Sequence, residues 1–456
     1  MSQATAVPGA FAQLLLPELR EILARSPGEL DDATSEIHPA DLAELVAALK
    51  PREQRTFLTA LPPARSADVL EHLDDTTRKK LLIALDDRTA ASILNAAAAD
   101  DRADMLAKLP PSRAATILSV LARAVREETA GLLAYPPNTA GGRMTTEFVA
   151  LPEKTRVDQA LALVRRAARE KEALHTLYLT GAANEIIGVV SMQALLAADD
   201  RATLIDVADK SFQSVPPLAD QEEVATLISK YDLLAMPVVD VQRRLLGIVT
   251  VDDVVDVVVE EATEDVQRLG GVSPIEEGYF QAGFWSLVRK RGLWLLVIFV
   301  GELLTGTVLR RFEDEFRGTL SLVFFIPLIL SSGGNSGSQS ATLVTRGLAV
   351  GDVRLADFAR IFGREVVMGL TLGAFLGAVG FVRAMMWHTG AGVSAVVGMT
   401  LAGVVMAGSI VGALLPLGFK RLGVDPAFAS SPFVASLVDV VGIVLYVLIA
   451  KAVLGV

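Results

Sequence analysis

The sequence contains no cysteine and only four histidines. Without cysteine the chain can form neither disulfides nor thiolate metal sites, as is usual in a reducing cytosol. The histidines (His38, His72, His175 and His388) are widely spaced, so the His-Glu-x-x-His pattern of an intramembrane metalloprotease is absent. The sequence also has no glycine-rich phosphate loop with a lysine. These absences argue against an enzyme and against an ATP-driven pump.

Positive charge is scarce in the first part of the chain. Residues 1–285 contain 44 acidic and 28 basic residues, whereas residues 286–456 contain 9 acidic and 14 basic ones. An acidic surface repels nucleic acid, so we expect no nucleic-acid partner. It also repels itself unless cations neutralise it, although an ordinary solvated face would give the same composition. The start of the chain, over positions 1–30, lacks a basic stretch followed by an apolar core, and we expect no cleavable signal peptide.

The first segment carries an internal repeat. Leucines recur at every twelfth position from Leu58 to Leu118, and a second series from Leu49 to Leu121 lies three positions away from the first, with Ala97 in one place. Leucines three apart share one face of a short helix. A single short helix cannot bury that face, so the repeats are expected to stack on one another. We predict an all-α superhelical solenoid within a domain of residues 1–137.

Residues 138–262 alternate β-rich runs with helical periodicity. The run Ile187–Ser191 recurs 59 positions later as Leu246–Thr250, which predicts a tandem of two small α/β units, at about 138–200 and 201–262. A long connecting helix is expected over residues 263–290, with a break near Gly270-Gly271. The expected strands are Thr176–Thr180, Ile186–Ser191, Met236–Asp240 and Leu245–Thr250.

Five apolar stretches follow in residues 291–456, each long enough to cross the ~30 Å hydrocarbon core of a lipid bilayer. Nine Lys and Arg residues flank these spans on one side and five on the other. By the positive-inside rule, the N-terminal domains are expected in the cytosol and the C-terminus outside the cell (inner) membrane. The expected spans are about 291–309, 318–345, 364–387, 391–419 and 427–450.

Polar residues interrupt two of these spans. Asp439 is the only charged residue between Asp425 and Lys451, and a lone carboxylate at bilayer depth usually faces a partner or a water-filled pathway. In span two, glycines, serines and Asn335 form a second polar island, which we interpret as a loosened helix beside water. A helix-packing seam of small residues is the alternative for that island. For Asp439 the alternative is a buried acid that is bonded to Ser436 or kept protonated. Glu302 is either a structural partner or a second pathway residue.

These residue types favour a hard cation. Carboxylate, amide and carbonyl oxygens without cysteine or clustered histidine select Mg²⁺ or Ca²⁺ among divalent cations, and a symmetric dimer would bring two Asp439 side chains to one axis. Two other classes stay open. A proton- or sodium-coupled divalent cation transporter could use Asp439 as its titrating carrier. A gated anion channel would instead need positive charge along its pathway.

At these positions the chain resembles the MgtE family of magnesium channels over nearly its whole length. Four motifs in the family's order carry the resemblance: Thr139–Thr146, Thr250–Asp256 with Glu261–Asp265, Gly333–Thr342, and Arg421–Ala427 through Asp439. The resemblance implies a homodimer with a helical N-terminal domain, a pair of CBS modules, a plug helix and five spans per chain. It also implies uptake of Mg²⁺ as the function.

The resemblance further implies roles for individual residues. Asp439 would be the pore acid that binds hydrated Mg²⁺, and Gly333, Asn335, Ser431 and Ala435 would line the pathway. Mg²⁺ in the cytosol would close the channel by bridging acids of the N-terminal domain, CBS modules and plug. The matching acids are Asp68, Asp100, Asp104, Asp220, Glu222, Asp232, Asp253, Asp256, Glu261, Glu264, Asp265 and Asp425.

Family CBS modules can bind ATP, and the Thr250-x-x-Asp253 spacing would suit ribose hydroxyls. The first module has Ala194 in place of the acid. Three positions near the pathway also depart from the family: Ser431 replaces an asparagine, and Ser336 and Ser338 replace a threonine and an asparagine. These changes shorten oxygen-bearing side chains and bear on ion selectivity.

Overall fold

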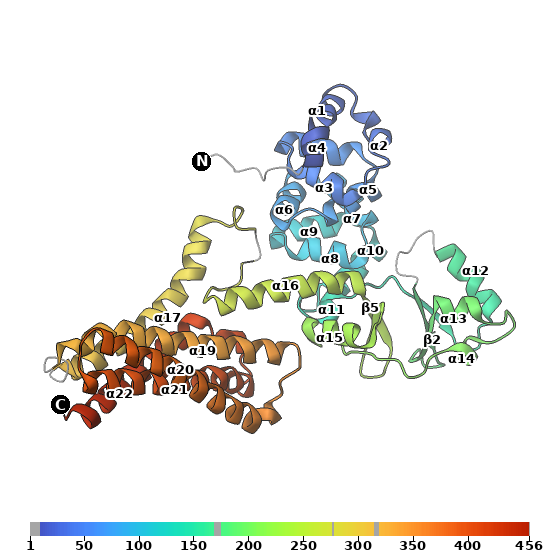
Figure 1. The fold of residues 1–456 in the computed structure, drawn as a ribbon. Helices are drawn as coiled ribbons and strands as arrows, with labels where there is room; N and C mark the ends of the chain where they lie inside the picture. The colour runs from blue at the N-terminus through green and yellow to red at the C-terminus, as the bar shows by residue number, and fades with distance from the viewer. Residues whose placement is uncertain (1–9, 168–174, 276–277, 314–318, 456) are drawn as a thin grey trace. The chain divides into compact units, whose positions relative to one another are not determined.

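A computed structural model describes residues 10–167, 175–275, 278–313 and 319–455 (Figure 1). The chain divides into two compact units, Met1–Glu261 and Ala262–Val456. We describe each unit by itself.

The first unit begins with the repeat helices. After α1 (Ala10–Arg25), η1 (Pro27–Glu29) and α2 (Leu30–Ala33), eight helices follow, and each starts twelve positions after the one before, from Pro39 to Arg123. Proline in the first turn or an aspartate cap fixes many of these starts; the Asp86 carboxylate accepts hydrogen bonds from the N–H groups of Arg88 and Thr89. The eight helices are α3 (Pro39–Ala47), α4 (Pro51–Ala60), α5 (Pro63–Glu71), α6 (Asp75–Ala84), α7 (Asp87–Ala96), α8 (Ala99–Ala107), α9 (Pro111–Val120) and α10 (Arg123–Leu132).

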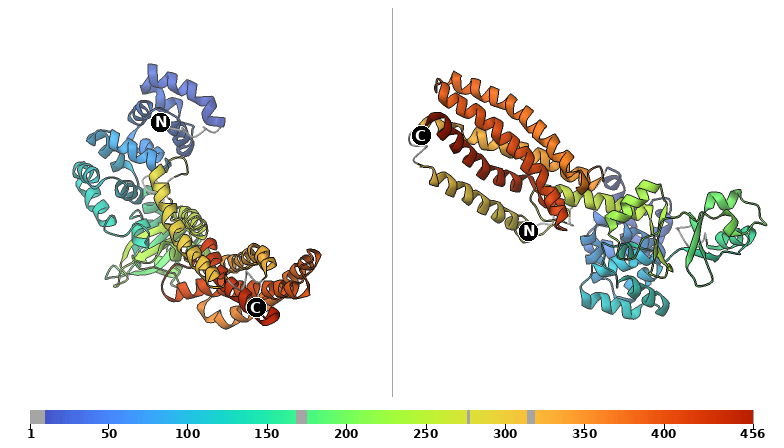
Figure 2. Two further views of the ribbon diagram at one scale, coloured as in Figure 1. Left: turned by 90° about the vertical axis from the view of Figure 1, so that its left-hand side faces the viewer. Right: turned by 90° about the horizontal axis from the view of Figure 1, so that it is seen from below.

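Each repeat helix packs chiefly on the second helix along the chain rather than on the next one. The pairs α3–α5, α5–α7 and α7–α9 form one row, and α4–α6 and α8–α10 belong to another. The leucines of both sequence series fill one continuous core between these rows, with Leu58, Leu70, Leu82 and Leu94 almost fully buried. The predicted solenoid is therefore confirmed (Figures 1 and 2).

Two small sheets follow in the same unit. The first has the strand order β1-β2-β3, with β1 parallel to β2 and β2 antiparallel to β3, and the second pairs β4 with β5 antiparallel. The α/β region is thus present, and its four expected strands lie within one residue of the expected bounds, whereas β1 was not expected. Its elements are α11 (Ala140–Arg143), β1 (Val149–Pro152), α12 (Val157–Ala167), β2 (Thr176–Thr180), β3 (Ile186–Ser191), α13 (Met192–Ala197), α14 (Leu204–Val207), α15 (Gln221–Tyr231), β4 (Ala235–Val239) and β5 (Leu245–Thr250).

The connecting segment breaks near Gly270-Gly271 as expected, but the long helix before the break starts at Val251 rather than at residue 263. Helix α16 (Val251–Leu269) starts directly after β5 and ends before Gly270, and α17 begins only at Phe284. Gly271 has φ +70°, a left-handed conformation that glycine adopts without strain and that ends the helix. The Gln267 side chain then accepts a hydrogen bond from the Ile275 N–H at 2.6 Å, which holds the following loop against the end of α16.

The second unit contains five helices, among the residues described, that are long and apolar enough to cross a membrane, in agreement with the five expected spans. Helix α21 packs on α19 and α20, and the long helices lie side by side in the right-hand view of Figure 2. Helix α17 packs mainly on α22, and only 6% of its most apolar stretch is buried. The elements are α17 (Phe284–Arg311), η2 (Leu320–Phe325), α19 (Ile326–Ala349), η3 (Leu355–Asp357), α20 (Phe358–Met386), α21 (Ala391–Arg421), η4 (Pro426–Phe428) and α22 (Ser431–Leu454).

The glycines of span two do not loosen the helix, contrary to our interpretation. Helix α19 is continuous from Ile326 to Ala349, and Pro327 lies in its first turn, where proline is tolerated. The glycines instead allow close helix packing: a Cβ added to Gly408 would lie 2.4 Å from the Gly333 oxygen, and one added to Gly412 would lie 2.0 Å from the Gly337 oxygen. The glycines of span two thus belong to a helix-packing seam of small residues, which was the alternative interpretation.

Candidate functional site

Asp439 lies on α22 where that helix packs against α19. A Cβ added to Gly334 would be 3.1 Å from the Ala435 Cβ and 3.9 Å from Asp439 Oδ1, so the glycine leaves room for both side chains. Asp439 is half-buried, and among the described residues no cation lies within ion-pair distance of it. An acid in an apolar span without a counter-ion has to be hydrated, neutralised by a proton or paired with a cation.

One face of α19 is polar and uncovered in the single chain. Ser331, Asn335, Gln339 and Thr342 are exposed and recur at helical spacing, and the Asn335 amide donates a hydrogen bond to the Ser331 hydroxyl at 3.4 Å. Polar side chains of this kind are poorly placed against lipid tails. The face of α19 defined by these four residues, called the polar face below, is therefore suited to water or to another protein surface.

The other predicted pathway residues have different surroundings. Gly333 is buried against α21 and α22, since an added Cβ would lie 2.2 Å from Val404 and 3.0 Å from Val438. Ser431 is half-buried in the first turn of α22, where its carbonyl accepts a hydrogen bond from the Ser338 hydroxyl at 3.0 Å. Ala435 is half-buried and packs on Gly334. The structure thus places Asn335 on the polar face, whereas Gly333 serves packing.

Glu302 and Ser436 form a contact that the sequence analysis did not assign. The Ser436 hydroxyl donates a hydrogen bond to Glu302 Oε1 at 3.1 Å. The alternative for Asp439, in which Ser436 bonds to Asp439, is therefore not what the structure shows. A second contact of this kind was missed altogether: the Ser340 hydroxyl donates to Glu365 Oε2 at 2.7 Å. The only signal for it was a lone acid at the start of an apolar stretch.

In the first unit, Asp100 on α8 and Asp253 on α16 form an electrostatically unfavourable pair. Burial, with repulsion from Asp101, raises the pKa of Asp100 to about 7. Burial, with repulsion from Asp100, raises the pKa of Asp253 to about 7. Among the described residues Asp100 Oδ1 has no hydrogen-bond partner although it is buried, whereas Asp253 Oδ2 accepts one from the Thr250 hydroxyl at 2.5 Å. A proton or a cation would relieve this pair.

Asp101, which the prediction omitted, extends the same cluster. Burial is the main cause that raises the pKa of its carboxyl to about 7, followed by repulsion from Glu71 and Asp253. Asp68, on α5, also has a raised pKa because of burial, which the charges of His72 and Arg65 partly offset. The sequence held a signal for Asp101, since it directly follows Asp100.

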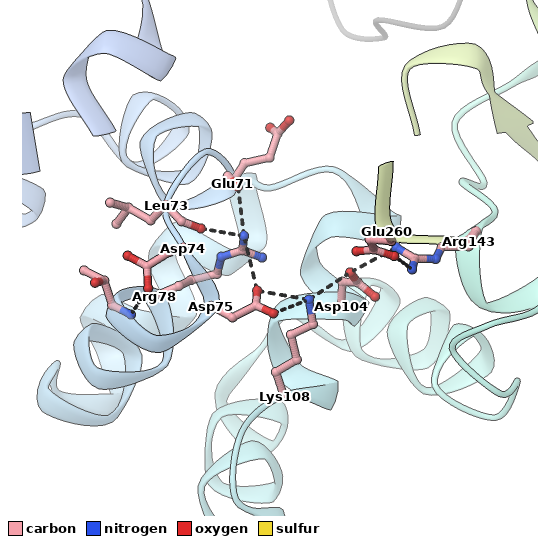
Figure 3. Close-up of polar contacts among 10 residues, drawn as sticks. Glu71, Leu73, Asp74, Asp75, Arg78, Asp104, Lys108, Arg143 and Glu260 are labelled. Atoms are coloured by element: carbon pink, nitrogen blue, oxygen red, sulfur yellow. Dashed lines mark hydrogen bonds and ion pairs between the residues drawn. The ribbon is translucent and has the colours of Figure 1, made fainter. Parts of the chain in front are cut away.

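Asp104 is already surrounded by basic side chains (Figure 3). Its carboxylate lies 3.8 Å from Lys108 Nζ and 3.9 Å from Arg143 Nη1. Lys108 also binds Asp75 at 2.8 Å, and Arg143 binds Glu260 at 2.5 Å. Asp75 and Glu260 were not among the predicted acids, because the sequence does not show that α6, α8 and the middle of α16 meet here.

The acids of the second α/β unit have local structural roles. Asp220 caps α15 by accepting a hydrogen bond from the Glu222 N–H at 2.8 Å, and Asp232 ends that helix with φ +50°. Glu261 accepts a hydrogen bond from the Gln221 amide at 2.6 Å. Asp256 and Glu222 are exposed on their helices.

In the second unit, the end of α16 binds the loop before α22. The Arg268 guanidinium forms ion pairs with Glu264, one turn earlier, and with Asp425. It also lies 5.3 Å above the Phe428 ring, which stacks on Trp294 at 5.7 Å. Asp265 is half-buried beside Glu264. Two of the predicted sensing acids therefore share a single arginine.

Within the described part of the chain, no three acidic or histidine side chains gather closely enough to hold a metal ion. The structure brings Asp100 together with Asp253, and Glu264 with Asp425. The remaining predicted acids are spread over several elements.

Comparisons with known proteins agree with this architecture. Residues 326–449 match the MgtE family, described as divalent cation transporters; residues 37–138 match the MgtE intracellular N domain, and residues 204–260 a CBS domain. The chain is 38% identical over 428 residues to the magnesium transporter MgtE of Thermus thermophilus, covering 93% of this chain and 95% of that protein. The chain belongs to the MgtE family.

Two further family members extend the comparison. The magnesium transporter MgtE of Enterococcus faecalis is 34% identical over 322 residues, which is 70% of each chain. A crystal structure of the cytosolic domain of the Mg²⁺ channel MgtE in complex with ATP matches with 36% identity and a TM-score of 0.51, covering 54% of this chain and 99% of that one. MgtE proteins are transporters and not enzymes. This member is a multi-pass membrane protein with a soluble N-terminal region.

Proposed function

We propose that the protein is a channel that takes up Mg²⁺ across the cell membrane and works as a homodimer. The observation that carries the proposal is the polar face of α19 beside Asp439, in a unit with five apolar helices. Exposed hydroxyl and amide groups at this depth can contact a hydrated cation, and Asp439 supplies the negative charge. Mg²⁺ gives up its bound water reluctantly. Contacts from the protein to that bound water therefore suit it better than direct coordination by protein ligands alone.

Two copies of the chain would make the site more complete. One Asp439 per chain is few ligands for a divalent ion, whereas a two-fold axis beside the polar face supplies two carboxylates and two Asn335 amides. The same arrangement would remove the polar face from lipid. In this dimer the N-terminal region lies in the cytosol and the C-terminus outside, as the excess of Lys and Arg on one side of the spans favours.

Cytosolic Mg²⁺ would close the channel through the acids of the first unit and the end of α16. The repulsion between Asp100 and Asp253 supports this step, because a structure that places two buried carboxylates together is favoured when a cation binds them. Without Mg²⁺ the contact between α8 and α16 is weakened. The remaining sensing acids named above would contribute in the same way.

ATP would be a second ligand of the soluble region. A related cytosolic domain was crystallised with ATP, and Thr250 and Asp253 stand at the spacing suited to ribose hydroxyls. In this chain the two side chains bond to each other, so nucleotide binding would have to replace that hydrogen bond. Calorimetry of the full protein tests this role, and heat on addition of Mg²⁺ with none on addition of ATP would rule it out.

The pore proposal is tested by flux in proteoliposomes. Native protein should pass Mg²⁺ down its gradient with single-channel currents, and Asp439→Ala should lose nearly all flux while its unfolding temperature is retained. Glu365→Gln is a matched acid replacement in another span. Flux of Asp439→Ala equal to native would refute the pore role. Mg²⁺ movement that requires a proton or sodium gradient would instead support a coupled divalent cation transporter.

A further inference from the structure

Asp425 has both carboxylate oxygens engaged. Oδ1 accepts a hydrogen bond from the Ala427 N–H at 2.8 Å and so caps η4, while Oδ2 is held by Arg268. The hydrogen bond to Oδ1 fixes the orientation of the Asp425 carboxylate, so that Oδ2 faces the Arg268 guanidinium. A cation that approaches Asp425 from the side of Oδ2 therefore meets the guanidinium first.

Arg268 is well placed to stay there. It lies in the last turn of α16, where the helix dipole favours a cation, and Glu264 is one turn earlier on the same face. Its planar group covers the Phe428 ring. The side chains of Arg268, Glu264 and Asp425 are 23%, 28% and 30% exposed, so the trio is only partly screened by water.

We propose that Arg268 sets the Mg²⁺ concentration at which the channel closes, by competing with Mg²⁺ for Glu264 and Asp425. This inference rests on the proposed closure by cytosolic Mg²⁺. With the arginine in place the trio carries one net negative charge, and without it two. A divalent cation is attracted less to the first arrangement, and it also has to displace the guanidinium from Oδ2 before it can bind there.

The competition predicts the direction of a single replacement. Arg268→Gln removes the charge and leaves a side chain of similar reach, so Mg²⁺ should close the reconstituted full-length channel at a concentration about tenfold lower, the order expected when a unit charge leaves a partly exposed carboxylate pair. Arg268→Lys keeps the charge but loses the planar fork, and we expect a fall of about threefold. A threshold that is unchanged or raised in either variant would overturn the proposal.

The acids provide a double-mutant test. In a variant with Asp425→Asn and Glu264→Gln, the two carboxylates for which Arg268 and Mg²⁺ compete are gone. Adding Arg268→Gln to this variant should therefore not shift the Mg²⁺ concentration at which the channel closes. Arg360→Gln is the matched control, because Arg360 is 85% exposed and its ion-pair partner among the described residues is Asp357, at 3.3 Å. A shift that persists without the two acids, or that Arg360→Gln reproduces, would contradict the competition.

Trp294 gives a readout of binding that does not depend on flux. It stacks on Phe428, the ring under Arg268, and the chain has only two other tryptophans, Trp285 and Trp387, which can be changed to phenylalanine. Mg²⁺ titration of the remaining emission in detergent should half-saturate at about tenfold lower concentration in Arg268→Gln, and an unchanged midpoint would overturn the proposal. If native protein conducts but Mg²⁺ never closes it, the proposed gating fails instead, whatever the fluorescence shows.

Discussion

The carboxylate of Asp100 on α8 repels that of Asp253 on α16, and Asp100 Oδ1 is buried without a hydrogen-bond partner among the described residues. Helices from two different domains of the family thus meet at a point of like charge. Such a contact stores unfavourable free energy until the charge is neutralised. The first prediction concerns how protons and Mg²⁺ act on it.

Stability of the Mg²⁺-free protein should fall as pH rises from about 4 to about 7. The pKa of Asp100 and of Asp253 is about 7 in the folded chain against 3.8 ordinarily, so between these values the folded state binds more protons than the unfolded state. Above pH 7 this contribution to the free energy of unfolding is fully lost, and adding Mg²⁺ should restore part of the stability. Unfolding temperatures of the full-length protein in detergent at pH 5 and pH 8, with and without Mg²⁺, measure the effect. Asp253→Asn should flatten the pH dependence, and an equally steep dependence in that variant would contradict this origin.

Neutralising Asp253, Asp256 and Glu261 together should leave the pore conducting at millimolar-range Mg²⁺, where native protein closes. The three acids lie along α16, and without their charge Mg²⁺ gains little by bringing α8 and α15 toward that helix. Flux against Mg²⁺ concentration in proteoliposomes is the measurement. Normal closure of the triple variant would show that sensing lies elsewhere.

Gly412→Ala should destabilise the membrane unit by at least about 2 kcal/mol, since overpacking of a tight contact typically costs about 1–3 kcal/mol. The added Cβ would stand 2.0 Å from the Gly337 oxygen, a backbone atom that cannot turn away. Gly418→Ala is the control on the same helix, where an added Cβ meets nothing within 4 Å. Thermal unfolding in detergent should separate the two variants, and equal stabilities would mean that α19 and α21 are not in close contact.

The sequence predicted elements whose signal is local and periodic. The recurring leucines gave the repeat helices, because each leucine reports burial of its own turn, and apolar length gave the five spans. The glycine motif in span two was assigned wrongly as a loosened helix. Composition alone cannot distinguish a glycine that frees the backbone from one that admits a neighbouring helix, and the carbonyl of Gly333 or Gly337 becomes visible as a neighbour of α21 only in three dimensions.

Counter-ions were the other feature that the sequence could not provide. The acids were selected one at a time through a family resemblance, but Arg143 reaches Glu260 across 117 positions and Arg268 reaches Asp425 across 157. No periodic pattern links residues so distant. Of the acids with a raised pKa in the first unit, Asp68, Asp100 and Asp253 were predicted as residues and Asp101 was not. The mutual repulsion of Asp100 and Asp253 depends on packing between α8 and α16.

The alternation of odd and even helices in the solenoid limits how its length can change. Because α5 packs on α3 and α7, deleting one helical repeat would move every later helix into the opposite row. Deleting two repeats would return each helix to its own row with its leucines still inward. Gain or loss of repeats during evolution should therefore proceed in pairs, and a chain shortened by a single repeat would have to rebuild every contact beyond the cut.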